Sequence, residues 1–193
     1  MPTTVSRKID AQPDALAQAL SRAEFLATLA RAVAEERGAA STVLFLVDVD
    51  QLRNVNDRHG QAVGDAVLRE TAERIAAALR DPDWSMHEGV LARFDGDGFI
   101  VMLRWCRLSF TERLAEDLRK RIARAPFPQG LRVTVSIGVS AHRRGESIDA
   151  LLARTERTLH LAKQFGGDRI ETARTPEPHG RRALPTSTDF LRV

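Results

Sequence analysis

The chain has 193 residues, of which 43% are hydrophobic and 28% are charged, and its formal net charge is +3. This balance is typical of a soluble globular domain, and the length allows one well-packed domain or two small ones. The single cysteine excludes an internal disulfide, and no apolar run is long enough to cross a bilayer. We therefore expect a cytoplasmic protein without a signal peptide or a membrane partner. The arginines are spread along the chain rather than clustered, which argues against nucleic-acid binding.

The first predicted helix follows a polar segment, residues 1–20, that reads as a flexible arm. Ser21 and Glu24 have the spacing of a capping box, and apolar residues with helical spacing follow until Gly38, where we expect the helix to end. Residues 42–47 (TVLFLV) then form a continuous apolar run, which is typical of a strand buried on both faces.

The second half of the domain is predicted to alternate helices and strands around a β-hairpin. The apolar spacing of residues 64–80 predicts a helix that ends at Asp81-Pro82. The hairpin is formed by VLARF and FIVML on either side of an Asp-Gly turn. The remaining predictions are a helix lined by Phe110, Leu114, Leu118 and Ile122, a strand at 132–140, a helix from Ser147 to Gly166, and a short strand at 169–172.

The order helix, strand, helix, strand, strand, helix, strand, helix predicts one α+β domain over residues 21–173, with a hairpin in its sheet. Beyond Arg174 the chain is rich in proline, arginine, serine and threonine. Residues 174–193 are therefore predicted to be a disordered tail.

Two pairs of aspartates follow predicted strands: Asp48 and Asp50 after the first strand, and Asp95 and Asp97 in the hairpin turn. The turn alone favours a structural interpretation, because Asp-Gly is a strong hairpin signal. Paired strands would nevertheless bring both pairs to one edge of the sheet. Carboxylates gathered there, with a backbone carbonyl, are ligands that Mg²⁺ uses when it also holds a nucleotide triphosphate.

The wider sequence resembles the GGDEF domains, the diguanylate cyclases that join two GTP molecules into cyclic di-GMP. The resemblance lies in VLFLVDVDQLRNVNDRHGQAVGDAVLRETAERI, in ARFDGDGFIVML at the signature hairpin, in VTVSIGVS and in LARTERTLHLAK, in the order of the family. It covers roughly residues 21–172. It implies the palm-like fold of that family, with a central, mainly antiparallel sheet and helices on its faces.

The resemblance implies a metal site that holds Mg²⁺ or Mn²⁺ when nucleotide is bound. Its residues would be Asp48, the backbone carbonyl of Val49, and Asp97, which matches the third signature position. Gly98 stands where the family has a glutamate implicated in catalysis, and loss of one such group typically costs roughly 10²–10⁴-fold in rate. Asp95 stands where the family has a glycine close to the nucleotide. Its charge would repel a triphosphate unless a metal lies between them.

The resemblance also implies a nucleotide site. Asn56 and Asp65 match the residues that hydrogen-bond guanine, and an amide with a carboxylate suits the donor and acceptor edge of that base. Arg53 and Lys163 match phosphate-binding positions, and Gly96 lies in the nucleotide-facing turn. Two structural alternatives stay open, since Asp65 also suits the start of a helix and Lys163 also suits a solvated helix end.

Other positions depart from the family. Gly167 stands where a phosphate-binding arginine is usual, and Arg169 is the nearest replacement. The product-inhibition site of the family, an Arg-x-x-Asp before the signature, has Met86 and Gly89 at its two positions. That site is therefore expected to be absent.

These observations favour a degenerate, catalytically impaired GGDEF domain that binds a guanine nucleotide, GTP or cyclic di-GMP, and passes that state to a protein partner. Two alternatives remain. The first is an active diguanylate cyclase with a variant signature, which requires two domains face to face and hence a homodimer or an equivalent pairing. The second is a protein-interaction module that no longer binds nucleotides.

Overall fold

The computed structural model describes residues 19–36, 41–84, 86–94, 96–106 and 108–173. Apart from residues 19 and 20, the predicted arm and tail lie outside the described residues, and so do Gly38 and Asp95. No helix in the described part of the chain combines the length and the apolar character needed to cross a membrane.

One five-stranded sheet forms the centre of the domain, and its strand order is β2-β3-β1-β4-β5. The pairs β2–β3, β3–β1 and β1–β4 are antiparallel, whereas the edge pair β4–β5 is parallel. The predicted α+β fold with a mainly antiparallel sheet is therefore confirmed. The strands are β1 (Ser41–Val49), β2 (Gly89–Phe94), β3 (Gly98–Cys106), β4 (Val135–Ala141) and β5 (Ile170–Thr172).

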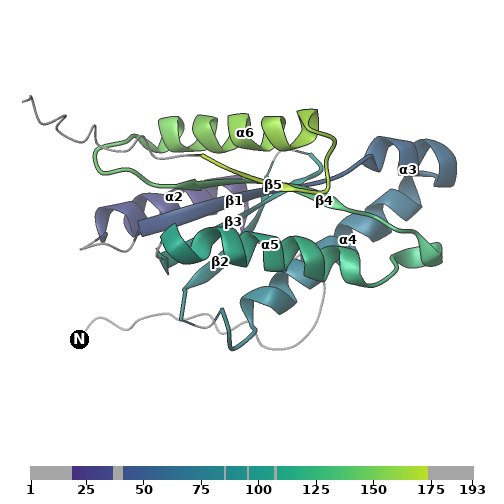
Figure 1. Cartoon of the computed structure of the whole chain (residues 1–193), viewed down its shortest axis with the longest axis horizontal. Coiled ribbons are helices and arrows are strands. Elements are labelled where there is room, and N and C mark those ends of the chain that lie inside the picture. Colours follow the sequence, from purple (N-terminus) through teal and green to yellow (C-terminus); the bar gives the residue numbers. More distant parts are fainter. Residues whose placement is uncertain (1–18, 37–40, 85, 95, 107, 174–193) are drawn as a thin grey trace, which may run out of the picture.

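Helices cover both faces of the sheet (Figure 1). Helices α2 and α6 pack on one face, and α4 and α5 pack on the other. A short helix, α3, extends beyond the C-terminal end of β1. The helices are α2 (Arg22–Ala34), α3 (Leu52–His59), α4 (Gln61–Leu79), α5 (Leu108–Arg124) and α6 (Ile148–Gln164), and a 3₁₀ turn (Pro128–Gly130) precedes β4.

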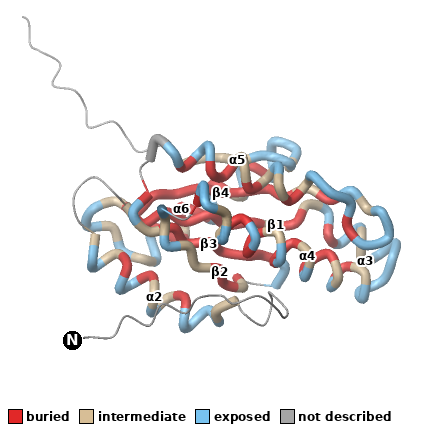
Figure 2. The backbone as a smooth tube through the Cα atoms, turned by 90° about the horizontal axis from the view of Figure 1, so that it is seen from below, coloured by how far each residue is buried: buried red, intermediate tan, exposed pale blue. Residues whose placement is uncertain are grey.

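Strand β1 lies at the centre of the sheet and is buried on both faces, as its continuous apolar run predicts (Figure 2). Phe45 points into the core under α4 and α5, whereas Leu44 points into the core under α2 and α6. Burying apolar surface contributes roughly 25 cal/mol for each Å² removed from water. This double burial fixes the position of β1, and therefore of the residues at its end.

Two of the predicted helix starts agree with the structure. Ser21 and Glu24 form the predicted capping box, and Ser147 caps α6 by accepting a hydrogen bond from the backbone N–H of Ala150. Helix α4 begins at Gln61, three residues before the predicted start. Asp65 therefore lies inside the helix, and the prediction that it could act as the N-cap is wrong.

Helix α3 has no counterpart among the predicted elements. It has only eight residues, and Leu52 is its one buried side chain, so the helical pattern is too weak to recognise. Gly60 separates α3 from α4 with φ 85° and ψ 159°, a conformation that favours glycine. The two helices fold against each other around this turn.

Gly138 allows α6 to lie close to the sheet. A Cβ atom at this position would be 2.4 Å from the backbone nitrogen of Leu159 and 2.6 Å from the carbonyl oxygen of Thr155. The absence of a side chain on β4 thus sets how near the backbone of α6 can come.

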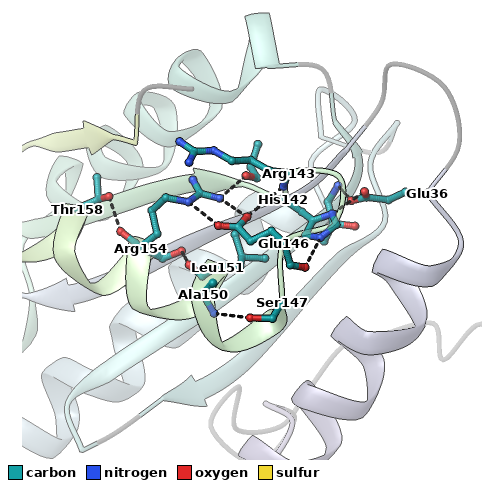
Figure 3. A network of polar contacts seen from close by, with 12 residues as sticks. Glu36, His142, Arg143, Glu146, Ser147, Ala150, Leu151, Arg154 and Thr158 are labelled. Carbon is teal, nitrogen blue, oxygen red and sulfur yellow. Dashed lines mark hydrogen bonds and ion pairs between the residues drawn. The ribbon is translucent and has the colours of Figure 1, made fainter. Parts of the chain in front are cut away.

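A buried polar network joins α2, β4 and α6 at the end of the sheet away from α3 (Figure 3). Arg154 of α6 binds both carboxylate oxygens of Glu146, at 2.9 and 2.6 Å, and donates to the carbonyl oxygen of Ala141 at 2.7 Å. His142 contacts Glu36 at 2.7 Å through Nδ1 and the carbonyl oxygen of Glu146 through Nε2. The network fixes the chain after α2 and the loop before α6 to the same strand end.

Candidate functional site

Asp48 and the hairpin turn meet at the end of β1. In the sheet register, Asp48 lies opposite Gly98 on one side and opposite Ser136 on the other. Asp97 precedes Gly98 and is exposed in the turn. The predicted metal-binding aspartates therefore come from adjacent strand ends, although the described residues contain no cluster of three or more acidic, histidine or cysteine side chains.

Arg93, on β2, holds the hairpin turn by hydrogen bonds to its backbone. Its Nε and Nη2 atoms donate to the carbonyl oxygen of Gly96 at 3.0 and 2.6 Å. Its guanidinium also lies over the ring of Phe99, 5.4 Å from the ring centroid, as in a cation–π contact. Gly96 has φ 63°, which suits glycine. One carbonyl of the turn is therefore engaged by the protein itself.

Lys163, near the C-terminus of α6, forms an ion pair with Asp48 at 2.5 Å. The side chains are 37% and 28% exposed, so the pair lies at the surface, where solvent screens it. This contact brings a predicted phosphate-binding group and a predicted metal ligand together. If a metal ion and a triphosphate were bound, Asp48 would contact the metal and Lys163 would contact a phosphate in place of this ion pair.

Asp50 holds together three segments that are far apart in sequence. Its carboxylate accepts hydrogen bonds from the hydroxyls of Thr134 and Ser136, both at 2.7 Å, and from the backbone N–H of Asp168 at 2.8 Å. Asp50 is therefore a structural anchor rather than an open metal ligand. Its partners became visible only in the structure, although polar residues alternating with valine around β4 are a signal for them.

The turn between α6 and β5 is held in an unusual conformation, with positive φ at Gly166, Gly167 and Asp168. A Cβ atom at Gly167 would lie 3.0 Å from the Asp50 carboxylate. Any side chain at position 167 would therefore be strained in this conformation. The turn leaves no space for the arginine that the family usually has at this position.

Two arginines near this turn are engaged by other residues. Arg119 of α5 pairs with Glu116 and Asp168, and these contacts raise the pKa of its guanidinium, the hydrogen bond to Glu116 most strongly. Arg169 donates to the carbonyl oxygen of Phe165 at 3.1 Å and pairs with Glu171 at 3.2 Å. In this structure Arg169 contacts residues close to it in the sequence, and its role as the replacement phosphate ligand stays a prediction.

The predicted base-binding residues lie on the α3–α4 pair. Asn56 belongs to α3, and its Oδ1 atom is buried without a hydrogen-bond partner. Asp65 is exposed on α4, and Arg53 is exposed near the start of α3. Because α3 follows β1 directly, these residues lie beyond the strand end that carries Asp48.

The residues at this edge are of the chemical type that binds a magnesium ion together with a nucleotide. Mg²⁺ prefers oxygen ligands and is usually held by one or two carboxylates together with water and substrate phosphates. A metal ion bound here would be held by the carboxylates of Asp48 and Asp97 and by the backbone carbonyl of Val49, which belong to adjacent strand ends. The small number of protein ligands agrees with this type of site.

The two positions of the family's product-inhibition motif carry no charged side chain. Met86 is 83% exposed, and Gly89 begins β2. Neither residue offers the ion-pairing groups of an Arg-x-x-Asp motif.

Comparison with known proteins identifies the family. The family model described as "Diguanylate cyclase, GGDEF domain" matches residues 11–169. Diguanylate cyclase DgcP of Pseudomonas aeruginosa is 34% identical over 140 residues, which are 71% of this chain and 20% of that protein. The chain spans only 20%, 36% and 30% of the length of the first three curated relatives.

Solved structures agree with this match. The coiled coil and GGDEF domain of DgcB from Caulobacter crescentus, solved in complex with c-di-GMP, has a TM-score of 0.71 and 27% identity, over 85% of this chain and 86% of that one. Diguanylate cyclase SiaD of Pseudomonas aeruginosa, solved with its activator SiaC, has a TM-score of 0.73 and 30% identity, over 82% of this chain and 60% of that one. The chain described here belongs to the GGDEF domain family of diguanylate cyclases.

Proposed function

We propose that this chain is a degenerate GGDEF domain of cyclic di-GMP signalling, impaired in catalysis, that acts as a regulatory module by binding a guanine nucleotide. The observation that carries the proposal is the pairing of Asp48 with Gly98. The metal-binding carboxylate is retained, while the position opposite it has no side chain. Lys163 also remains at the same strand end, in contact with Asp48.

Each retained residue has a distinct role in this proposal. Asp65 accepts hydrogen bonds from the N1–H and N2–H₂ donors of guanine, and Asn56 donates to an acceptor of the same base. Lys163 and Arg53 bind the phosphates, on which an ammonium acts as a point charge and a guanidinium as a planar fork. Mg²⁺, held by Asp48, Asp97 and the carbonyl of Val49, would neutralise phosphate charge when bound.

The ligand is proposed to be GTP or cyclic di-GMP, bound by the residues that match the substrate site of the family. The product-inhibition positions, Met86 and Gly89, offer no charged groups for a second cyclic di-GMP site. A protein partner is proposed as the receiver of the signal. The pairing of SiaD with an activator protein supports this idea by analogy.

An active cyclase is the second candidate, and the retention of Asp48 together with Asp97 favours it. In that case the 3′-hydroxyl of one GTP would attack the α-phosphate of another, across two domains that face each other. A homodimer would supply that arrangement. The missing carboxylate at Gly98 is the reason that we rank this function second.

The test is calorimetric titration of the protein with GTP and Mg²⁺. The solution recovered from the calorimeter is then analysed for cyclic di-GMP. A parallel titration uses cyclic di-GMP itself. The variant Asp65→Ala removes the proposed base-binding carboxylate. It should leave the fold intact, because this exposed residue supplies no helix cap.

Three results separate the candidates. Saturable heat that disappears in Asp65→Ala, without product, supports the regulatory module. Accumulation of cyclic di-GMP would establish an active cyclase with a variant signature. The absence of heat with either nucleotide would contradict both and favour a nucleotide-free interaction module.

A further inference from the structure

The carboxamide of Asn56 occupies the space that a side chain at Gly64 would fill. A Cβ atom at Gly64 would lie 1.7 Å from Oδ1 of Asn56 and 2.8 Å from its Cγ. Gly64 lies in the first turn of α4 and Asn56 lies near the end of α3, and the turn at Gly60 brings the two helices into contact. The Asn56 carboxamide therefore packs directly against the backbone of Gly64.

The backbone does not explain the presence of a glycine at position 64. Its φ is not positive, and it lies within a regular helix, where any residue except proline fits. Glycine is also the poorest helix former after proline. The remaining physical reason for Gly64 is steric, because only glycine leaves room for the Asn56 carboxamide.

The orientation of the Asn56 carboxamide is not explained by a hydrogen bond of its Oδ1 atom within the described residues. Its Oδ1 atom is buried against Gly64 and has no hydrogen-bond partner, which is unusual for a buried polar atom and calls for an explanation. With Oδ1 turned toward Gly64, the amide group Nδ2 is what Asn56 offers to a ligand. Asp65, the next residue after Gly64, offers a carboxylate from the same helix.

We propose that Gly64 is a positioning residue that determines base specificity by setting the orientation of the Asn56 carboxamide beside Asp65. This inference rests on the proposed function and deepens it. The pair presents one donor and one acceptor to the base. Guanine, with its N1–H and N2–H₂ donors beside the acceptor N3, fits this pair, whereas adenine has no donor at N1.

The experiment compares Gly64→Ala, Asn56→Ala and the double variant with the unmodified chain. The affinities for GTP and ATP, each with Mg²⁺, are measured by calorimetry, and melting temperatures are measured without ligand. Ala77→Gly, an exposed position on α4, is the control for helix propensity alone. It should lower the melting temperature and leave the ratio of GTP to ATP affinity unchanged.

A methyl group at position 64 must displace the Asn56 carboxamide. We expect Gly64→Ala to lower GTP affinity about tenfold, the size of one lost hydrogen bond, and to leave ATP affinity nearly unchanged. The double variant should bind GTP no more weakly than Asn56→Ala. The gain in melting temperature from alanine at position 64 should be larger when Asn56 is absent, because no clash then opposes it.

The outcomes separate this inference from the proposed function. If the unmodified chain gives heat with neither GTP nor cyclic di-GMP, the proposed function fails and the inference fails with it. If the unmodified chain binds GTP and Gly64→Ala keeps both its affinity and its selectivity, the inference alone is wrong. Equal losses of GTP and ATP affinity would also overturn it, since a general disturbance of the fold would act on both nucleotides.

Discussion

Asp48 lies directly opposite Gly98 in the pairing of β1 with β3. Opposite residues on adjacent strands project from the same face, with Cβ atoms about 4.5–5.5 Å apart. Gly98 has the same strand parity as Ile100 and Met102, which face α2 and α6. A glutamate at position 98 would therefore stand beside Asp48, on the side from which Lys163 approaches.

The variant Gly98→Glu tests the proposal that catalysis is impaired because position 98 has no carboxylate. We expect synthesis of cyclic di-GMP to rise by at least about 10²-fold, the smaller end of the usual contribution of a proton-transfer group. Without Mg²⁺ the second carboxylate should destabilise the fold by up to about 1 kcal/mol, through repulsion by Asp48. Product is measured by chromatography.

The control for this experiment is Gly98→Gln, which has the size of the glutamate variant without its charge. It should leave product formation at the level of the unmodified chain. If Gly98→Glu and Gly98→Gln both leave turnover unchanged, the missing carboxylate is not what limits this domain.

The contact between Lys163 and Asp48 yields a second prediction. The pair lies at the surface, so Lys163→Gln should change the free energy of unfolding by less than about 1 kcal/mol. Affinity for GTP should nevertheless fall about tenfold, while affinity for guanosine should stay the same, because the proposed role of the lysine is to bind phosphate and not the base. Calorimetry with both ligands measures the ratio.

Lys120→Gln is the matched control, because Lys120 is an exposed lysine on α5. It should change neither affinity. Equal loss of GTP and guanosine binding in Lys163→Gln would instead show that Lys163 supports the architecture of the site.

The sheet could be predicted from the sequence because its signal is local. The apolar run 42–47 and the alternating segment 132–140 both require burial, and neither depends on knowing the partner strand. The start of the second strand was predicted too early, because β4 begins at Val135. Helix α3 could not be predicted, because eight mostly polar residues do not define a helical face. It is fixed by the Gly60 turn and by packing against α4.

The candidate site was only partly accessible to sequence reasoning. The resemblance to the family gave its residue positions, but the register that places Asp48 opposite Gly98 depends on pairing between distant segments. The role of Asp50 was not foreseen for the same reason. Its partners Thr134 and Asp168 lie far along the chain and meet it only in the folded sheet.

Asp50 supports a third prediction, on stability. Asp50→Ala removes three hydrogen bonds to one carboxylate and leaves the buried hydroxyl of Ser136 without an acceptor. We expect the free energy of unfolding to fall by about 2–3 kcal/mol, as measured by urea denaturation. Asp57→Ala, an exposed change on α3, should remain within about 0.5 kcal/mol of the unmodified chain. A loss no larger than that of the control would contradict the anchoring role.

The pair of Arg154 and Glu146 predicts how stability depends on pH (Figure 3). Burial alone would raise the pKa of Glu146, but hydrogen bonds from Arg154 and from the backbone N–H of Arg143, with the charges of both arginines, outweigh it. The pKa of this carboxyl is therefore below its ordinary value of 4.5. The pair stabilises the fold fully above that value, and this stability is lost as the pH falls through the lowered pKa.

The variant Glu146→Gln isolates this contribution, because it keeps the shape of the side chain and removes its charge. At neutral pH it should lower the free energy of unfolding by about 3 kcal/mol, since it leaves the nearly buried Arg154 without a counterion. The difference from the unmodified chain should stay constant down to about pH 5 and shrink at lower pH, where Glu146 becomes protonated. Urea denaturation at several pH values measures it, and Glu156→Gln, an exposed change on α6, should follow the unmodified chain throughout. A difference that persists unchanged to about pH 3 would mean that the charge of Glu146 is not what stabilises this junction.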